Sequence, residues 1–217
     1  MKKIVLMAIT LLATMTSTAQ NESGTWSIIP KIGLNFSTMT QADIYYGDMK
    51  KAEPRTRRGF ALGVEAEYRR NVAALSAGVI YSQQGCNYAD MDGAFKNMET
   101  RLAYINVPVM AHFYIAPGLA IKAGIQPGFA VRRNQKGEEF TMETRPDGAT
   151  WSGYKSFSYD KSFYRTFDYT IPVGVSYDLD NLRIECRYNF TPHDATKYDL
   201  NEKNRYWQVT LGYRFEL

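Results

Sequence analysis

The chain has 217 residues, which suits a single domain, and aromatic residues make up 14% of it. Its formal net charge of +4 arises from 26 basic and 22 acidic residues that are spread along the sequence, so no nucleic-acid-binding patch is indicated. Cys86 and Cys186 are the two cysteines and no CxxC motif occurs, which argues against a disulfide scaffold and against metal or redox chemistry at the thiols.

The first twenty residues have the pattern of a secretory signal peptide. Lys2 and Lys3 precede an apolar run, and small residues follow that run before a cleavage point at Gln20. The run is too short to cross a membrane as a helix. We expect residues 1–20 to be removed. The mature domain 21–217 then has 24 basic residues, since two of the 26 are lost, against 22 acidic ones.

Alternation of apolar and polar residues, the pattern of β-strands, recurs along the mature chain. Eight segments show it: 26–36, 58–69, 73–84, 101–115, 119–132, 165–179, 182–190 and 205–217. The apolar stretch 104–125 resembles a transmembrane helix in hydropathy, but its prolines and the Pro117-Gly118 pair favour a hairpin.

The connections alternate in length. Short turns are expected near Asn71, at Pro117-Gly118 and at 178–181. Long polar loops are expected at 40–57, 85–100, 133–164 and 192–204. Short turns alternating with long loops are typical of outer-membrane β-barrels, with the turns and both termini on the periplasmic side. We expect the last strand to pair with the first and the seventh, because an open edge would leave backbone groups unpaired in lipid.

Each strand has an apolar face and a polar face. Which of the two faces outward decides whether the protein is a membrane barrel or a soluble barrel. The apolar residues occupy every second position of each strand, here called the apolar parity, and are bulky and often aromatic. The interior of an eight-stranded barrel has room only for a limited volume of side chains. The polar parity combines glycines with charges of both signs that can pair in a narrow lumen: Lys31, Glu65, Glu67, Lys122, Arg183, Glu185, Arg187, Arg214 and Glu216. These features predict an all-β, eight-stranded, antiparallel up-and-down transmembrane β-barrel with a lumen filled by side chains. The alternative is a soluble periplasmic lipocalin-like carrier with its apolar parity inside.

Several segments, namely PKIGLNFS (30–37), YINVPVMAHFYI (104–115), GIQPGF (124–129) and FDYTIPVGVSYDL (167–179), resemble the PorT-like outer-membrane barrels of Bacteroidetes-type Gram-negative bacteria. The resemblance covers about residues 24–217 and marks no active site. It implies the barrel fold and, by analogy of fold alone, an accessory role in protein secretion across the outer membrane. The chain end also resembles the strand signal read by barrel-assembly machinery, although it closes on Leu217 where phenylalanine is commoner.

No catalytic, cofactor-binding or metal-binding set emerges from the sequence. His112 has lumen parity, which favours a hydrogen-bonded interior histidine. His193 in the last long loop is the weak basis of an alternative, a rim enzyme acting on lipid A. Asp90 and Asp92 suggest calcium, but the twelfth position of an EF-hand loop counted from Asp90 is Arg101 rather than glutamate.

The expected partners are outer-membrane lipid, lipopolysaccharide, the barrel-assembly machinery during insertion, and a protein at the outer loops. Arg55, Arg57 and Arg58 suit lipopolysaccharide phosphates or form an ordinary charged rim. The aromatic stretch 151–169 favours a hairpin that continues the strands above the membrane, with partner binding as the alternative. The sequence thus predicts a non-enzymatic outer-membrane protein whose specificity resides in its outer loops.

Overall fold

The computed structural model describes residues 24–40, 44–46, 50–144, 146, 148, 150–160, 165–192 and 203–217. Its elements are all strands: β1 (Thr25–Thr40), β2 (Ile44–Tyr46), β3 (Lys50–Ala52), β4 (Pro54–Arg70), β5 (Ala73–Tyr88), β6 (Phe95–Asn106), β7 (Val109–Ala116), β8 (Leu119–Thr144), β9 (Thr150–Asp160), β10 (Phe167–Leu179), β11 (Leu182–Phe190), β12 (Lys203–Tyr213) and β13 (Phe215–Glu216). In this part of the chain, no helix is long and apolar enough to span a membrane.

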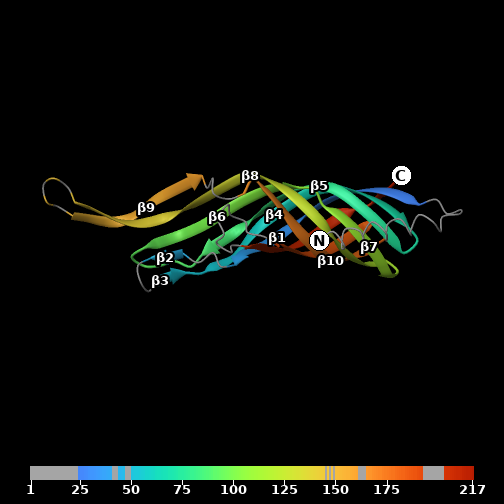
Figure 1. The fold of residues 1–217 in the computed structure, drawn as a ribbon, viewed down its shortest axis with the longest axis horizontal. Coiled ribbons are helices and arrows are strands. Elements are labelled where there is room, and N and C mark those ends of the chain that lie inside the picture. Colours follow the sequence, from blue (N-terminus) through green and yellow to red (C-terminus); the bar gives the residue numbers. More distant parts are fainter. Residues whose placement is uncertain are drawn as a thin grey trace.

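The strands close into a ring of eight antiparallel positions (Figure 1). The order is β1, β4, β5, then β6 with β7, then β8, β10, β11 and β12. β6 and β7 share one position because the strand is interrupted at Pro108, and β5 and β8 pair with both parts. β1 pairs with both β4 and β12, which closes the ring. The predicted fold class, and the pairing of the last strand with the first and the seventh, are confirmed.

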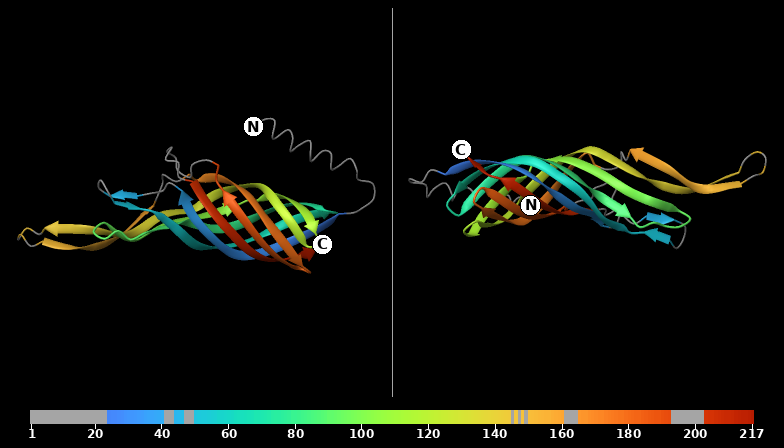
Figure 2. Two further views of the ribbon diagram at one scale, coloured as in Figure 1. Left: turned by 90° about the horizontal axis from the view of Figure 1, so that it is seen from below. Right: turned by 180° about the vertical axis from the view of Figure 1, so that it is seen from behind.

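The predicted short turns all lie at one end of the barrel, which we call the turn end. Asn71 and Asp180 have φ of 53°, and Gly118 has φ of 77°. Such left-handed conformations suit tight hairpins, and asparagine, aspartate and glycine tolerate them best. The last residue also lies here, since the Leu217 amide donates to the Trp26 carbonyl over 2.9 Å. The opposite end is the loop end (Figure 2).

The apolar parity faces outward around the barrel. On β7 and β8, Val109, Phe113 and Ile121 are each 46–49% exposed, whereas His112 and Lys122 between them are buried. A lipocalin-like barrel would show the reverse, so the structure does not support the alternative of a soluble carrier. The outward apolar wall is the arrangement of a barrel in lipid.

Strand structure extends well past the predicted spans at the loop end, so the prediction of long loops at 40–57, 85–100 and 133–164 is largely wrong; the first of these segments contains β2, β3 and the start of β4. β5 continues to Tyr88 and β6 begins at Phe95, which leaves a short connection between them. β8 runs for 26 residues, and its outer part forms a hairpin with β9 that projects beyond the barrel (Figure 1). The expected hairpin in the aromatic stretch is therefore present. Ladder pairing satisfies the backbone groups of these extensions.

The apolar pattern inverts where the extension begins. On β6, Ile105 faces lipid, while Leu102 and Tyr104 face inward and are buried. They belong to an interior cluster, here called the apolar cap, with these buried members: Met39, Cys86, Tyr88, Met91, Ala94, Met98, Leu102 and Tyr104. A wall surrounded by water must place its apolar side chains inside, so the inversion marks the outer boundary of the lipid-facing band.

Candidate functional site

Buried charges fill the turn-end half of the lumen. Seven of the nine predicted lumen residues are at most 4% exposed, namely Lys31, Glu65, Glu67, Lys122, Arg183, Glu185 and Arg187. Together with Asp178 they form what we call the lumen charge cluster, in which four cations face four carboxylates. Buried charges are tolerated when they are paired in this way.

One half of the cluster is centred on two glutamates. Lys31 Nζ lies 2.7 Å from Glu65 Oε2 and 3.2 Å from Glu185 Oε2. Lys122 Nζ lies 2.5 Å from the same Glu185 oxygen. Arg187 pairs with both Glu65 and Glu185. Each carboxylate therefore has at least two cationic partners and is committed to the network.

The other half is centred on Arg183. Its guanidinium pairs with both oxygens of Glu67 and donates to the two oxygens of Asp178 over 2.6 and 2.9 Å. Tyr114 Oη accepts a further hydrogen bond from Arg183 over 2.8 Å. His112 Nδ1 lies 2.9 Å from Glu67 Oε2, so the histidine is part of a buried polar network.

Glycines beside the charged residues supply the room that these long side chains need. Gly63 and Gly212 flank Lys31 on the neighbouring strands, and Gly174 is the partner of both Lys122 and Arg187. A Cβ on Gly174 would lie 2.3 Å from the Cys186 carbonyl oxygen. Pairing each large residue with a small one lets a narrow barrel hold charged side chains across its interior.

The last two predicted lumen residues lie at the turn-end mouth. Arg214 Nη1 is 2.9 Å from Asp178 Oδ2, and Arg214 Nε is 3.3 Å from Glu216 Oε1. The Glu216 side chain is 57% exposed, so it belongs to the rim rather than to the interior. The prediction omitted Asp178, although its polar parity at the end of a strand was a signal for it.

Neutral polar side chains occupy the lumen between the charge cluster and the apolar cap. Asn35 Nδ2 donates to Ser82 Oγ over 2.9 Å, and Gln208 Nε2 donates to Asn35 Oδ1 over 3.0 Å. Gln126 Nε2 donates to the Tyr206 hydroxyl over 2.6 Å. From the turn end to the loop end, the lumen thus contains a charged layer, a layer of neutral polar side chains and an apolar layer. Side chains therefore fill the interior of the barrel.

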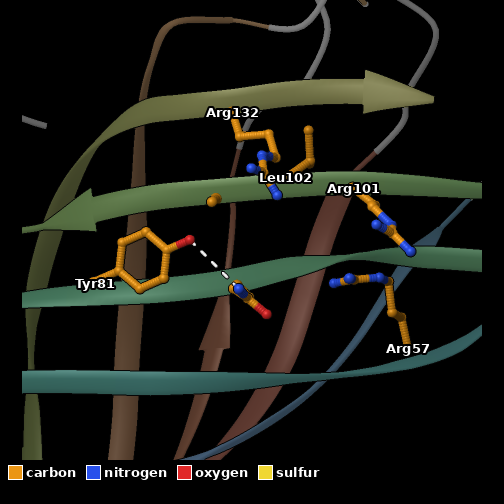
Figure 3. A pocket seen from close by; sticks show the side chains of 7 residues that line it. Arg57, Tyr81, Arg101, Leu102 and Arg132 are labelled. Atoms are coloured by element: carbon orange, nitrogen blue, oxygen red, sulfur yellow. Dashed lines mark hydrogen bonds between the residues drawn. The ribbon is translucent and has the colours of Figure 1, made fainter. Parts of the chain in front are cut away.

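A second candidate site lies on the wall above the lipid-facing band. Arg57 on β4, Arg101 on β6 and Arg132 on β8 line a pocket of about 150 Å³, whose floor includes Tyr81 and Ala103. Figure 3 shows Arg57 and Arg101 pointing toward one another across β5. We call this the arginine pocket. Converging guanidinium groups create a site for an anion.

Glu99 is the carboxylate beside this pocket. Its oxygens lie 2.5 Å from Arg101 Nη2, 3.3 Å from Lys136 Nζ and 3.6 Å from Arg57 Nε. Partial burial acts to raise the pKa of Glu99, but its bonds to Arg101 and Lys136 outweigh burial and hold the pKa below the ordinary value. Glu99 is therefore ionised at neutral pH and offsets part of the positive charge.

The structure places the predicted surface arginines differently. Arg57 lines the pocket, whereas Arg55 and Arg58 are exposed elsewhere on β4. Counting alternate residues along the predicted strand 119–132 places Arg132 on the lumen side with Lys122, but Arg132 is exposed and lines the pocket on the outer wall. The reason is a bulge, because Ala103 pairs with Arg132 while the next residue of β6 pairs with Ala130. The extra residue reverses the parity, as bulges do.

Other sequence candidates have structural roles or lie outside the described residues. Asp90 Oδ1 accepts a hydrogen bond from the Asn97 amide over 2.8 Å, and Asp92 pairs with Lys96. His193 and the signal-peptide residues 1–20 are not in the described part of the chain, so those expectations stay predictions.

Together the closed ring, the lipid-facing outer wall and the charged interior define a transmembrane β-barrel. The family model for the outer membrane protein beta-barrel domain matches residues 18–197, and the chain belongs to this family. It is therefore an outer-membrane β-barrel protein of a Gram-negative cell. The PorT-like grouping is finer than this family and stays a prediction.

Solved structures with a similar fold include three outer-membrane barrels. Ail of Yersinia pestis has 17% identity and a TM-score of 0.46, and Neisserial surface protein A has 13% and 0.44. The N-terminal barrel domain of Pseudomonas aeruginosa OprF has 13% and 0.33. Each match covers 89% of this chain and 100% of the other. No curated protein matches the chain significantly.

Proposed function

We propose that this protein is a non-enzymatic outer-membrane anchor that presents a β-hairpin to a protein partner outside the cell. The observation that carries this proposal is the β8–β9 hairpin, in which residues 134–144 pair with 150–160 beyond the barrel wall. In this proposal the turn end and both termini face the periplasm, and assembly machinery inserts the barrel from that side.

The root of the hairpin is fixed and its outer part is accessible. Phe157 packs against the apolar cap, and the Tyr154 hydroxyl accepts a hydrogen bond from the Gly93 amide over 3.0 Å. Farther out, Trp151 and Met142 are 48% and 69% exposed. Exposed aromatic side chains on a held backbone are effective anchors for a protein partner, because little conformational freedom remains to be lost on binding.

The free edge of β9 supports the same proposal. Within the described residues, β9 has β8 as its partner on one side and no strand on the other. An exposed strand edge accepts a further strand through backbone hydrogen bonds. A partner that contributes an extended segment would therefore use both the edge and the aromatic side chains.

The test is site-specific photo-crosslinking in living cells. With the photoreactive residue at position 151, we expect a discrete adduct of higher mass. The matched control places it at Arg205, which is exposed at the loop end but lies on β12. Equal adducts at both positions, or none at 151, would contradict the proposal. Protease treatment of intact cells tests orientation separately, since cleavage within 140–153 is expected only if the hairpin is outside.

A further inference from the structure

The arginine pocket lies at the level where lipid headgroups meet the wall. Tyr81 at its floor pairs with Leu62 and Ile105, both of which belong to the lipid-facing band. Ala103 and Arg101 lie two and four residues before Ile105, toward the loop end, on the same face of β6. At about 3.3 Å per residue, the pocket therefore begins only two to four residues above Ile105, the last lipid-facing side chain of β6.

The pocket holds more positive charge than its surroundings neutralise. Four cationic side chains, those of Arg57, Arg101, Arg132 and Lys136, are arranged around or beside it, and Glu99 is the acid in contact with three of them. Among the described residues, Arg132 forms no ion pair. Arg101 Nε is buried there without a hydrogen-bond partner, so it has donor capacity left for a ligand.

We propose that Arg57, Arg101 and Arg132 bind a phosphate group of an outer-leaflet glycolipid, such as the lipid A part of lipopolysaccharide. Guanidinium groups match the oxygens of phosphate with paired hydrogen bonds, and three of them approach the pocket from three strands. The adjoining Tyr81 ring and Ile105 would lie against the sugar and the acyl chains. The three arginines lie outside the hairpin, and their proposed role does not depend on that of the hairpin.

The bulge in β8 supports this assignment. Without the extra residue, Arg132 would take the inward position opposite Leu102 that Arg133 occupies instead. The bulge moves the charge to the outer wall and adds it to the pocket. Bulges that redirect a side chain in this way commonly occur at binding sites.

The experiment measures binding of the full mature protein, in detergent, to diphosphorylated lipid A by native mass spectrometry. Lipid A without phosphates and inorganic phosphate serve as the comparison ligands. Because a charge-assisted hydrogen bond lost on substitution corresponds to about tenfold in affinity, Arg132→Gln and Arg101→Gln are each expected to weaken lipid A binding about tenfold. Glu99→Gln removes the competing carboxylate and is expected to strengthen it severalfold.

The matched control is Arg205→Gln, which removes one exposed arginine at the loop end on β12, four ring positions from β6. It should change affinity less than twofold, and every variant must keep the heat-modifiable migration of a folded barrel. Equal losses at Arg132 and Arg205, or equal binding of lipid A with and without phosphates, would overturn the proposal. If inorganic phosphate bound as tightly as lipid A, the proposal that the ligand is a glycolipid would be overturned.

Discussion

Lys31 Nζ lies 2.7 Å from Glu65 Oε2 in the barrel interior, and neither side chain is more than 1% exposed. In water such a pair contributes little, but here each group would be left buried and charged if the other were removed. The pair links β1 to β4, and Arg187 on β11 joins it through Glu65. The cluster therefore ties strands from both sides of the ring closure.

Glu65→Gln is expected to lower the free energy of unfolding by about 3–5 kcal/mol, because it leaves Lys31 and Arg187 short of a carboxylate. The measurement is equilibrium urea unfolding of protein refolded into vesicles, followed by tryptophan fluorescence. Glu216→Gln is the matched control and should change the free energy of unfolding by less than about 1 kcal/mol, since that carboxylate is exposed at the rim.

Replacing both Lys31 and Glu65 by Met should destabilise the barrel by less than the sum of the single changes Lys31→Met and Glu65→Met. Additive effects would show that the two charges do not interact.

Arg183→Lys is expected to destabilise by about 2 kcal/mol or more even though the charge is kept. Arg183 bonds to two carboxylates at once, and an ammonium group cannot reproduce that planar fork. Arg214→Lys, which affects a more exposed partner of the same Asp178, should have a smaller effect in the same urea assay. If the two substitutions were equal, charge alone and not the geometry of the fork would stabilise the cluster.

Gly174→Ala is expected to destabilise by about 1–3 kcal/mol, since the added Cβ would lie 2.3 Å from the Cys186 carbonyl oxygen and force the backbone to move. Ser176→Ala, two residues along β10, is the control. Ser176 is buried on the same face, and its hydroxyl has no hydrogen-bond partner among the described residues, so its loss should be close to neutral. Thermal gel-shift midpoints of both variants give the comparison. A tolerated alanine at 174 would mean that the strands are not closely packed there.

The sequence predicted the faces of the membrane band well because lipid imposes a simple rule. Any outward residue there must be apolar, so Val109 and Phe113 fix the inward direction of His112 and hence of the charged residues on the same parity. The rule ends where the lipid ends. Met98 and Leu102 are inward apolar residues of the extension. Met98 lies in the segment 85–100 for which the sequence predicts a polar loop, and Leu102 lies at the start of the predicted strand 101–115.

Two further features escaped prediction because they depend on pairing rather than on period. One extra residue in β8 turns Arg132 outward, and parity counting along a single strand cannot detect a bulge that is defined by its neighbour. Likewise, the arginine pocket combines residues from β4, β6 and β8, of which only Arg57 belonged to the basic stretch that suggested an anion site.

The inversion of the apolar pattern on β6 gives the last prediction. Leu102→Ala removes a side chain that is 1% exposed within the apolar cap and is expected to destabilise by about 2–5 kcal/mol. Ile105→Ala, three residues away, removes a side chain that is 40% exposed on the opposite face. In a bilayer, lipid chains fill the vacated space, so this change should cost about 2 kcal/mol, the transfer free energy of three carbons without the added cost of a cavity. Urea unfolding in vesicles compares the two, and a cost at Ile105 equal to that at Leu102 would mean that Ile105 faces protein and that the boundary of the lipid-facing band lies elsewhere.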